Sequence, residues 1–347
     1  MAIKRGVSFY SYQQAQFFKE MDYKDMCREL RENLGCGGVE IINEATVPNF
    51  PFPSKEFLAD WWNTMARYDL TPVALDGFLD PLRFRDHVMN KKEAGEYVKL
   101  ELQLAHDMGF KHIRSMTGLP TEVIERALDT AVKLDVGIAW EIHSPIPIKA
   151  DTSITGLYCD SPGTAVADTV EFIKKTGTKH VGFVPDMGIF MNGPYLDNIE
   201  GALRRMKDRA MAANIEAMMK EIPLAKLGEE VEKQHPGALD TLEGWDKRAF
   251  QWKTVALPED LELILPYVFS IHGKVHNMIE VAPGVYDDPV TMNKEVIDVL
   301  KRNNWDGYIC TEYEGQRSYQ DLPKEQLADE VEQVRRHHQM LKRYIEN

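Results

Sequence analysis

Cysteine is scarce in this sequence and shows no pairing pattern. Only four cysteines occur among 347 residues, and no two of them form a C-x-x-C pair. Structural zinc sites and thiol–disulfide exchange both depend on closely spaced cysteines, so the sequence gives no sign of either. We therefore expect four free thiols, at Cys27, Cys36, Cys159 and Cys310.

Positive charge and long apolar runs are also in short supply. Lys and Arg number 41 against 55 Asp and Glu, which gives a formal net charge of −14, and no basic cluster or stripe stands out. A nucleic acid or an anionic membrane surface is therefore not an expected partner, and a small neutral or cationic ligand fits better. No segment approaches the roughly 18 apolar residues of a spanning helix, and the first residues lack the apolar run of a secretory signal. These absences predict a cytoplasmic protein.

Short β-branched or aromatic runs alternate with helical patterns along the whole chain. This alternation is typical of parallel strands joined by crossover helices, and α/β barrels commonly exceed about 250 residues as one domain. We predict a (β/α)₈ TIM barrel in a single domain spanning residues 1–347. Its eight strands are expected at residues 6–10, 38–42, 71–76, 112–116, 136–143, 180–184, 268–274 and 308–312.

One connection is too long for a plain βαβ unit, which needs about 30 residues. Residues 189–257, between the sixth and seventh strands, are predicted to form a helical insertion. It includes a methionine-rich helix candidate at 206–219 and an aromatic segment at 245–252. Because the insertion follows a strand, we expect it on the active-site face of the barrel, as a lid, a partner-docking surface or a plain surface subdomain.

Polar side chains collect at the ends of the last four predicted strands, where a barrel enzyme carries its reactive groups. Side chains alternate faces along a strand, so residues two positions apart point the same way. The pairs or sets that share a face are Glu141 with His143, His272 with Lys274 and His276, and Glu312 with Glu314; Asp186 follows the sixth strand.

Carboxylates and an imidazole that converge on one point favour a divalent cation, because the cation relieves the repulsion between the carboxylates. Hard oxygen donors with one nitrogen suit manganese first, with magnesium, cobalt or zinc as alternatives. Taken singly, each of these residues is more often a solvated, ion-paired or structural group. The succession of ligand-type residues on four strands is what favours the metal hypothesis.

The order Glu, Asp, His, Glu on strands five to eight resembles the xylose isomerase-like superfamily of sugar isomerases and epimerases. The resemblance implies that Glu141, Asp186, His272 and Glu312 are the metal ligands. Glu312 is preferred to Glu314 because it lies nearer the regular part of its strand, although the spacing also allows the swap.

Within that superfamily, four segments resemble the α subunit of bacterial C-glycoside deglycosidases. They are RGVSFYSYQ at 5–13, GVEI at 38–41, NFPFPS at 49–54 and IHGK at 271–274. The resemblance implies a metal-dependent lyase that cleaves the C–C bond between a 3-oxo sugar and a flavonoid or other phenolic aglycone, together with a small β subunit in a hetero-oligomer. Epimerases of this superfamily commonly pair two glutamates across the sugar, whereas here His143 lies beside Glu141.

His143 is therefore the candidate catalytic base, since a neutral imidazole near pH 7 can remove a proton from carbon beside a carbonyl. The alternative is that His143 only orients a neighbouring metal ligand. Lys274, His276, Arg114 and Glu40 also lie near strand ends and are candidates for substrate binding, although Lys274 also fits an ordinary ion pair. Two other functions stay open: an aldose–ketose isomerase or 3-epimerase acting through an enediolate, and a non-catalytic scaffold subunit.

Overall fold

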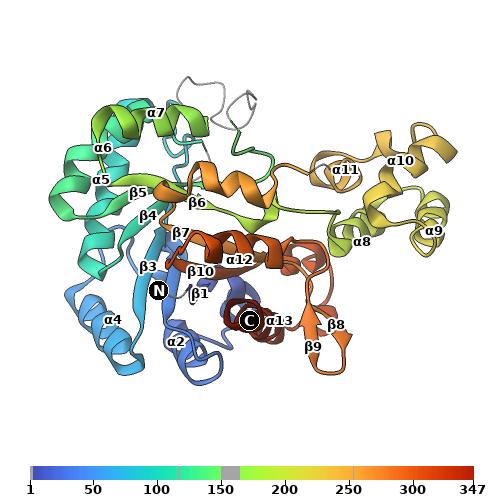
Figure 1. Ribbon diagram of the computed structural model, residues 1–347, viewed down its shortest axis with the longest axis horizontal. Coiled ribbons are helices and arrows are strands. Elements are labelled where there is room, and N and C mark those ends of the chain that lie inside the picture. Colours follow the sequence, from blue (N-terminus) through green and yellow to red (C-terminus); the bar gives the residue numbers. More distant parts are fainter. Residues whose placement is uncertain (1–2, 116–117, 150–164, 253) are drawn as a thin grey trace.

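The computed structural model describes residues 3–115, 118–149, 165–252 and 254–347. Eight parallel strands form one sheet in the order β6-β5-β4-β3-β2-β1-β10-β7. Bridges from β6 and the residue after it to the β7 segment, Phe183 with Val268 and Asp186 with His272, bring the two edges of the sheet together. The predicted barrel is confirmed (Figure 1). Its strands are β1 (Lys4–Ser8), β2 (Gly38–Ile42), β3 (Thr71–Asp76), β4 (His112–Ser115), β5 (Gly137–Ile142), β6 (Val181–Pro185), β7 (Ser270–Val275) and β10 (Tyr308–Tyr313).

The strand predictions match the structure to within a few residues. The largest difference is at the N-terminus, where β1 covers Lys4–Ser8 and the chain turns into a short 3-10 helix at Phe9–Tyr12. The last residue of the predicted fourth strand, Met116, lies outside the described residues, as does Cys159. Cys27, Cys36 and Cys310 are free and buried, as predicted.

Helices surround the barrel, and their ends follow local sequence signals. The longest, α5, begins after Asn90, whose side chain accepts backbone N–H groups while Glu93 bonds back to the Asn90 N–H. It ends at Gly109 in the left-handed region, which glycine adopts without steric penalty. The helices are α1 (Gln13–Phe17), α2 (Tyr23–Glu32), α3 (Asn43–Thr46), α4 (Lys55–Tyr68), α5 (Lys91–Met108), α6 (Thr121–Leu134), α7 (Val166–Thr176), α12 (Asn293–Arg302) and α13 (Glu330–Glu346).

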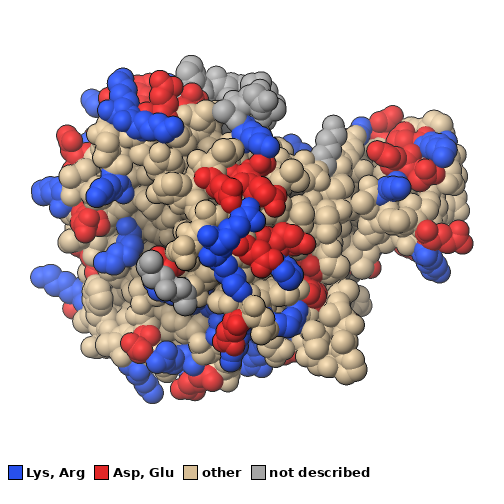
Figure 2. Space-filling model, in the orientation of Figure 1, with Lys and Arg blue, Asp and Glu red and all other residues tan. Residues whose placement is uncertain are grey.

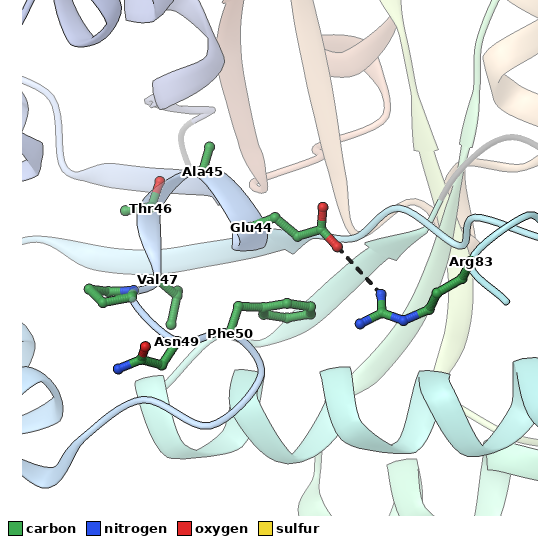
Figure 3. A pocket seen from close by; sticks show the side chains of 8 residues that line it. Glu44, Ala45, Thr46, Val47, Asn49, Phe50 and Arg83 are labelled. Carbon is green, nitrogen blue, oxygen red and sulfur yellow. Dashed lines mark ion pairs between the residues drawn. The ribbon is translucent and has the colours of Figure 1, made fainter. Parts of the chain in front are cut away.

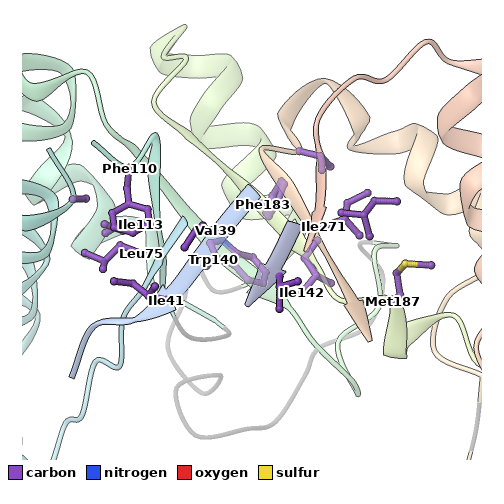
Figure 4. Close-up of a cluster of buried hydrophobic side chains, with 14 of the residues drawn as sticks. Val39, Ile41, Leu75, Phe110, Ile113, Trp140, Ile142, Phe183, Met187 and Ile271 are labelled. Atoms are coloured by element: carbon purple, nitrogen blue, oxygen red, sulfur yellow. The ribbon is translucent and has the colours of Figure 1, made fainter. Parts of the chain in front are cut away.

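The main hydrophobic core lies between the outer faces of the strands and the helices. Residues such as Ile41, Leu75, Trp140 and Phe183 are fully buried there (Figure 4). The Trp140 ring contacts Phe183 edge-on at 5.2 Å between centroids, and its indole N–H donates to Thr169. Trp140 therefore serves packing.

The inner faces of the strands are unusually polar. Barrel interiors are commonly filled by Val, Ile and Leu. Here a group of small, polar and ionisable side chains is buried instead: Ser8, Glu40, Asp76, His112, Arg114, Glu141, Ser270, His272, Lys274 and Glu312. Because burying charged groups costs free energy unless they are paired or bind a cation, this interior points to function rather than to stability.

Between β6 and β7 the chain forms four helices, α8 (Leu196–Arg205), α9 (Arg209–Met218), α10 (Leu224–Gln234) and α11 (Gly244–Phe250). They enclose a hydrophobic cluster of their own, separate from the barrel core. Figure 1 shows them projecting to one side of the barrel. Close packing joins α10 to α11, since a Cβ on Gly228 would lie 1.9 Å from the Phe250 carbonyl oxygen.

A two-stranded antiparallel hairpin, β8 (Ile279–Ala282) with β9 (Val285–Asp287), follows β7 and was not predicted. Its β9 strand packs on α13, where Arg343 donates to the Tyr286 carbonyl and the Asp287 carboxylate.

The surface of the molecule carries both signs of charge, interspersed over the face seen in Figure 2.

Candidate metal centre and active site

Four ligand-type side chains meet inside the mouth of the barrel. Glu141 on β5, Asp186 after β6, His272 on β7 and Glu312 on β10 each offer a ligand atom, and these atoms all lie within 4.8 Å of one another. None of the four residues is more than 6% exposed. The parallel strands bring their C-terminal ends to the same edge, so residues separated by up to 171 positions in the sequence converge.

The contacts within this group are short. His272 Nδ1 lies 2.8 Å from Glu141 Oε1 and 3.4 Å from Glu312 Oε2. Asp186 Oδ1 accepts the backbone N–H of Gly188, while its Oδ2 is buried without a well-directed hydrogen bond. Three carboxylates and one imidazole are a donor set for a divalent ion. The residues therefore fit a metal.

Lys274 places an ammonium group among the same carboxylates. Its Nζ lies 2.7 Å from Asp186 Oδ2, 2.6 Å from Glu312 Oε2 and 2.9 Å from Glu314 Oε2. Burial would lower the pKa of Lys274, but these carboxylates raise it well above its usual range. The ammonium thus stays charged and offsets part of the negative charge of the four clustered side chains.

The same charges shift the pKa values of the carboxylates. Burial raises the pKa of Asp186 to about 6, against the opposing effect of Lys274. For Glu312, burial acts in the same direction, but Lys274 and His272 outweigh it and hold the pKa well below the usual range. The pKa of Glu141 is also lowered, because Arg114 and His272 together outweigh the effect of its burial.

A second layer of charged groups lies deeper in the barrel. Glu40 Oε1 lies 3.0 Å from His272 Nε2, on the side of the ring opposite Glu141. Arg114 Nε lies 3.2 Å from Asp76 Oδ1, and its NH1 lies 3.7 Å from Glu141 Oε2. Glu40 and Arg114, predicted to bind substrate, are thus at most 3% exposed and in contact with other protein groups.

Glu40, Asp76 and His272 also lie close enough together to hold an ion. The guanidinium of Arg114 already supplies a positive charge to Asp76, so the deeper layer has its own cation. Its contacts run to His272 and Glu141, and these contacts support two members of the upper group from below.

His143 stands beside the four clustered side chains, half-buried, just after β5. Its Nδ1 lies 2.8 Å from the Ser144 carbonyl oxygen, which can only accept a hydrogen bond, so Nδ1 carries the proton. Its Nε2 is 3.9 Å from Asp186 Oδ2. Burial lowers the pKa of His143, but the carboxylates of Asp186, Glu141 and Glu314 together outweigh it, so the pKa is raised above its usual value. The Nε2 atom is thus turned toward the clustered acids.

The opposite flank of the site is formed by Glu314 and His276. Glu314 Oε1 pairs with Arg317 at 3.0 Å, and its Oε2 contacts Lys274. His276 Nδ1 lies 3.0 Å from Oδ2 of Asp197, a residue of α8.

The sequence prediction missed Asp76, Asp197 and Arg317. Asp76 ends a strand with inward parity and was open to prediction, whereas Asp197 and Arg317 come from a helix and a loop whose packing no local pattern reveals.

A separate cavity of about 440 Å³ lies at the rim, between α3 with the loop after it and Arg83. Figure 3 shows Arg83 pointing across it toward Glu44, with the Phe50 ring beside the pair, and the distance from Arg83 NH1 to Glu44 Oε1 is 3.6 Å. None of the four clustered residues lines this cavity. It is therefore distinct from the metal centre.

No family model matches the sequence. Two curated relatives match along most of its length. The 3'-dehydrocarminate deglycosidase alpha subunit of a Microbacterium species is 24% identical over 334 residues, covering 89% of this chain and 88% of the relative. A C-glycoside deglycosidase alpha subunit of Arthrobacter globiformis is 24% identical over 324 residues, covering 91% of this chain and 84% of the relative. The resemblance to C-glycoside deglycosidase α subunits is thus confirmed.

Solved structures confirm the fold class. A sugar phosphate isomerase/epimerase from Parabacteroides distasonis superposes with a TM-score of 0.54 at 13% identity, covering 99% of this chain and 96% of that one. The IOLI protein, solved with a zinc atom bound, gives 0.53 at 14% identity, covering 99% of each chain. At these identities the likeness concerns the fold alone. Among the described helices, none combines the length and the hydrophobicity needed to cross a membrane.

Proposed function

We propose that this chain is the catalytic α subunit of a metal-dependent C-glycoside deglycosidase. It would cleave the C–C bond between a 3-oxo sugar and a phenolic aglycone. The observation that carries the proposal is the convergence of Glu141, Asp186, His272 and Glu312 beside His143, in a chain similar over about nine-tenths of its length to proteins named deglycosidase alpha subunits.

The four clustered side chains would be the metal ligands, with Glu312 rather than Glu314 as the last. Glu314 is paired with Arg317 at 3.0 Å, whereas Glu312 lies 3.4 Å from His272. Manganese is the expected ion, since the set is rich in carboxylate oxygen. When bound, the ion supplies Lewis acidity to the oxygens of the sugar, including the 3-oxo group.

His143 would act as the base. Its Nδ1–H donates to the Ser144 carbonyl. The lone pair of the neutral ring is then on Nε2, which lies 3.9 Å from Asp186 Oδ2 at the edge of the four clustered residues. The proton on C2 of a 3-oxo sugar is acidic because C2 lies beside the carbonyl, and Nε2 would remove it. Lys274, through its three carboxylate contacts, would keep the ligand carboxylates ionised and in place.

A small β subunit is the expected partner, because the relatives are named alpha subunits. The net charge of −14 fits a neutral glycoside as substrate better than an anionic one.

The proposal is tested by incubating the purified chain and Mn²⁺ with a 3-oxo-C-glucoside of a phenolic aglycone, with and without a candidate small subunit. Release of aglycone, followed by chromatography, is the expected result. The matched control is Asp135→Asn, which alters an exposed carboxylate at the far end of α6 and should behave as wild type. Interconversion of free ketoses or aldoses without aglycone release would replace the proposal by the isomerase alternative, and the absence of stoichiometric metal would favour a scaffold.

A further inference from the structure

One imidazole at the mouth of the barrel has no part in the chemistry described so far. His276 follows β7 directly and is 7% exposed. Its Nδ1 lies 3.0 Å from Asp197 Oδ2, and a carboxylate can only accept, so Nδ1 carries the proton. An aspartate that holds one ring nitrogen of a histidine leaves the other nitrogen free for proton transfer, which is the arrangement of an oriented acid–base group.

The residues that hold this ring come from the start of the insertion. Asp197 lies in the first turn of α8, is 1% exposed, and also accepts the Ser318 hydroxyl at 2.6 Å. The Tyr195 ring stacks on His276 with centroids 3.8 Å apart and an interplanar angle of 14°. Tyr195 is itself fixed by a 2.9 Å hydrogen bond between its hydroxyl and Thr291. The imidazole thus has a single defined orientation.

The free Nε2 of His276 faces the metal centre. It lies 3.8 Å from Glu314 Oε2, too far for a hydrogen bond, and Glu314 contacts Lys274 at 2.9 Å. Lys274 in turn contacts Asp186, which is the acid nearest to His143. The two imidazoles therefore belong to strands β5 and β7 and flank the same group of charges from opposite ends.

We propose that His276 is the second acid–base group of this site, and that Asp197 and Tyr195 are positioning residues supplied by the insertion. The inference rests on the proposed function. In the reacting form His276 carries a proton on both ring nitrogens, and Nε2 donates its proton to the aglycone carbon as the C–C bond breaks while Nδ1–H stays with Asp197.

In the first part of the reaction, His143 Nε2 takes the C2 proton. The electron pair of the C2–H bond stays on the sugar, which becomes the enolate of the 3-oxo sugar. Its collapse forms the C1–C2 double bond and breaks the bond from C1 to the aglycone, whose electron pair goes to the aglycone carbon. That carbon takes the proton of His276 Nε2. The products are an unsaturated 3-oxo sugar and the free aglycone, and the two histidines regain their starting states by exchanging protons with solvent.

Other groups on this flank are less suited to donate the proton. The Lys274 ammonium is held by three carboxylates at 2.6 to 2.9 Å. Glu314 is paired through Oε1 with Arg317 at 3.0 Å and through Oε2 with Lys274 at 2.9 Å, so both of its oxygens already contact cations. His276 has one nitrogen committed to Asp197 and one that is free.

The test separates proton removal from bond cleavage. The full chain, with Mn²⁺ and the candidate small subunit, is given a 3-oxo-C-glucoside in D₂O. Mass spectrometry follows deuterium at C2 of the recovered substrate, corrected for exchange without protein, and chromatography follows released aglycone. His276→Asn should keep C2 exchange within about threefold of wild type and lower aglycone release by about 100-fold or more, as expected for loss of a general acid. His143→Asn should lose both.

The matched control is His180→Asn. His180 also contacts an aspartate, Asp135 at 3.0 Å, but it lies at the N-terminal end of β6, on the opposite side of the barrel. Exchange and release should both stay at wild-type levels. Metal content, measured on every variant, should stay stoichiometric in His276→Asn.

A second measurement addresses the positioning role of Asp197. Asp197→Asn should lower kcat for release with little change in KM, while exchange continues. In the Mg²⁺-loaded protein, the ¹⁵N spectrum of His276 should show that the neutral ring, left after the Nε2 proton has gone, is a single tautomer with Nδ1 protonated, and Asp197→Asn should convert this neutral form to a mixture of tautomers. A role limited to anchoring the insertion would change stability and leave the kcat for release intact in the folded variant.

The outcomes are distinct. If wild type shows neither exchange nor release, the proposed function fails, and the role of His276 with it. If wild type does both and His276→Asn still releases aglycone at a normal rate, only the acid assignment is overturned. Loss of exchange together with release in a metal-loaded His276→Asn variant would also overturn it, because the residue would then belong to proton removal.

Discussion

A divalent ion should stabilise this protein, and removing one ligand carboxylate should abolish that effect. In the metal-free protein, Glu141, Asp186 and Glu312 crowd around His272 and are only partly compensated by Lys274 and Arg114. An ion that binds the folded chain alone adds the missing charge and shifts the unfolding equilibrium by mass action.

The size of the effect follows from the length of the chain. A ligand at 100 times its dissociation constant stabilises the folded state by about 2.7 kcal/mol. With an unfolding entropy of about 2.1 cal/mol/K per residue, 347 residues correspond to about 0.7 kcal/mol/K. The expected rise in Tm is therefore about 4 °C.

The assay is thermal unfolding of EDTA-treated protein titrated with Mn²⁺. Wild type is compared with Glu141→Gln, which keeps the shape of the side chain and removes its charge. Changes to groups that merely support a ligand weaken metal binding by about 10- to 100-fold, so loss of a ligand charge should weaken it by more than about 100-fold. At the same Mn²⁺ concentration the variant should shift by less than about 1 °C.

The matched control is Glu101→Gln, which makes the same substitution at another buried glutamate, on α5 and outside the four clustered residues. It should keep the full rise of about 4 °C. An equal rise in Glu141→Gln would show that the ion binds elsewhere, and the absence of any rise in wild type at millimolar Mn²⁺ would refute the reasoning from charge.

Three further predictions follow from other parts of the molecule. His143→Ala should abolish turnover while metal content, measured by mass spectrometry, stays at the wild-type level; substantial residual activity would remove His143 as the base. Glu101, whose pKa burial raises from 4.5 to about 8 against the Asn43 hydrogen bond, lends stability below pH 4.5 that is lost as the pH rises through 8. In urea melts, the stability of Glu101→Gln relative to wild type should therefore increase from pH 5 to pH 8, by at most about 5 kcal/mol. The same difference at both pH values would contradict the raised pKa of Glu101. Gly228→Ala should loosen α10 from α11, because its Cβ meets the Phe250 carbonyl at 1.9 Å, and limited proteolysis should then cut within 189–257 while the barrel stays intact; an uncut variant would argue against this packing.

Much of the barrel was predictable, because its signals are local. Parallel strands joined by helices produce a regular alternation of apolar runs, and each run can be recognised without knowing where the others lie. Six of the eight strands begin and end within one residue of their predicted bounds. The differences of two residues are at both ends of β1, which starts and stops early and is followed by a 3-10 helix, and at the start of β7.

The side of the strand on which each site residue lies was predictable for the same reason. Alternation along a strand places Lys274 on the same side as His272, and Glu314 on the same side as Glu312, whatever surrounds them. Strand order then brings the C-terminal ends together. The sequence alone thus determined which side chains point into the barrel mouth.

Only the tertiary structure decided what those side chains contact. The pairing of Arg114 with Asp76, the position of Glu40 beneath His272 and the approach of Asp197 to His276 join segments far apart in the chain. The alternation of side chains along a strand gives the direction of each side chain but not the residue that it contacts. For Asp197 in particular, the partner depends on how α8 packs against the barrel, and that packing is fixed by the sum of many weak contacts that no local pattern contains.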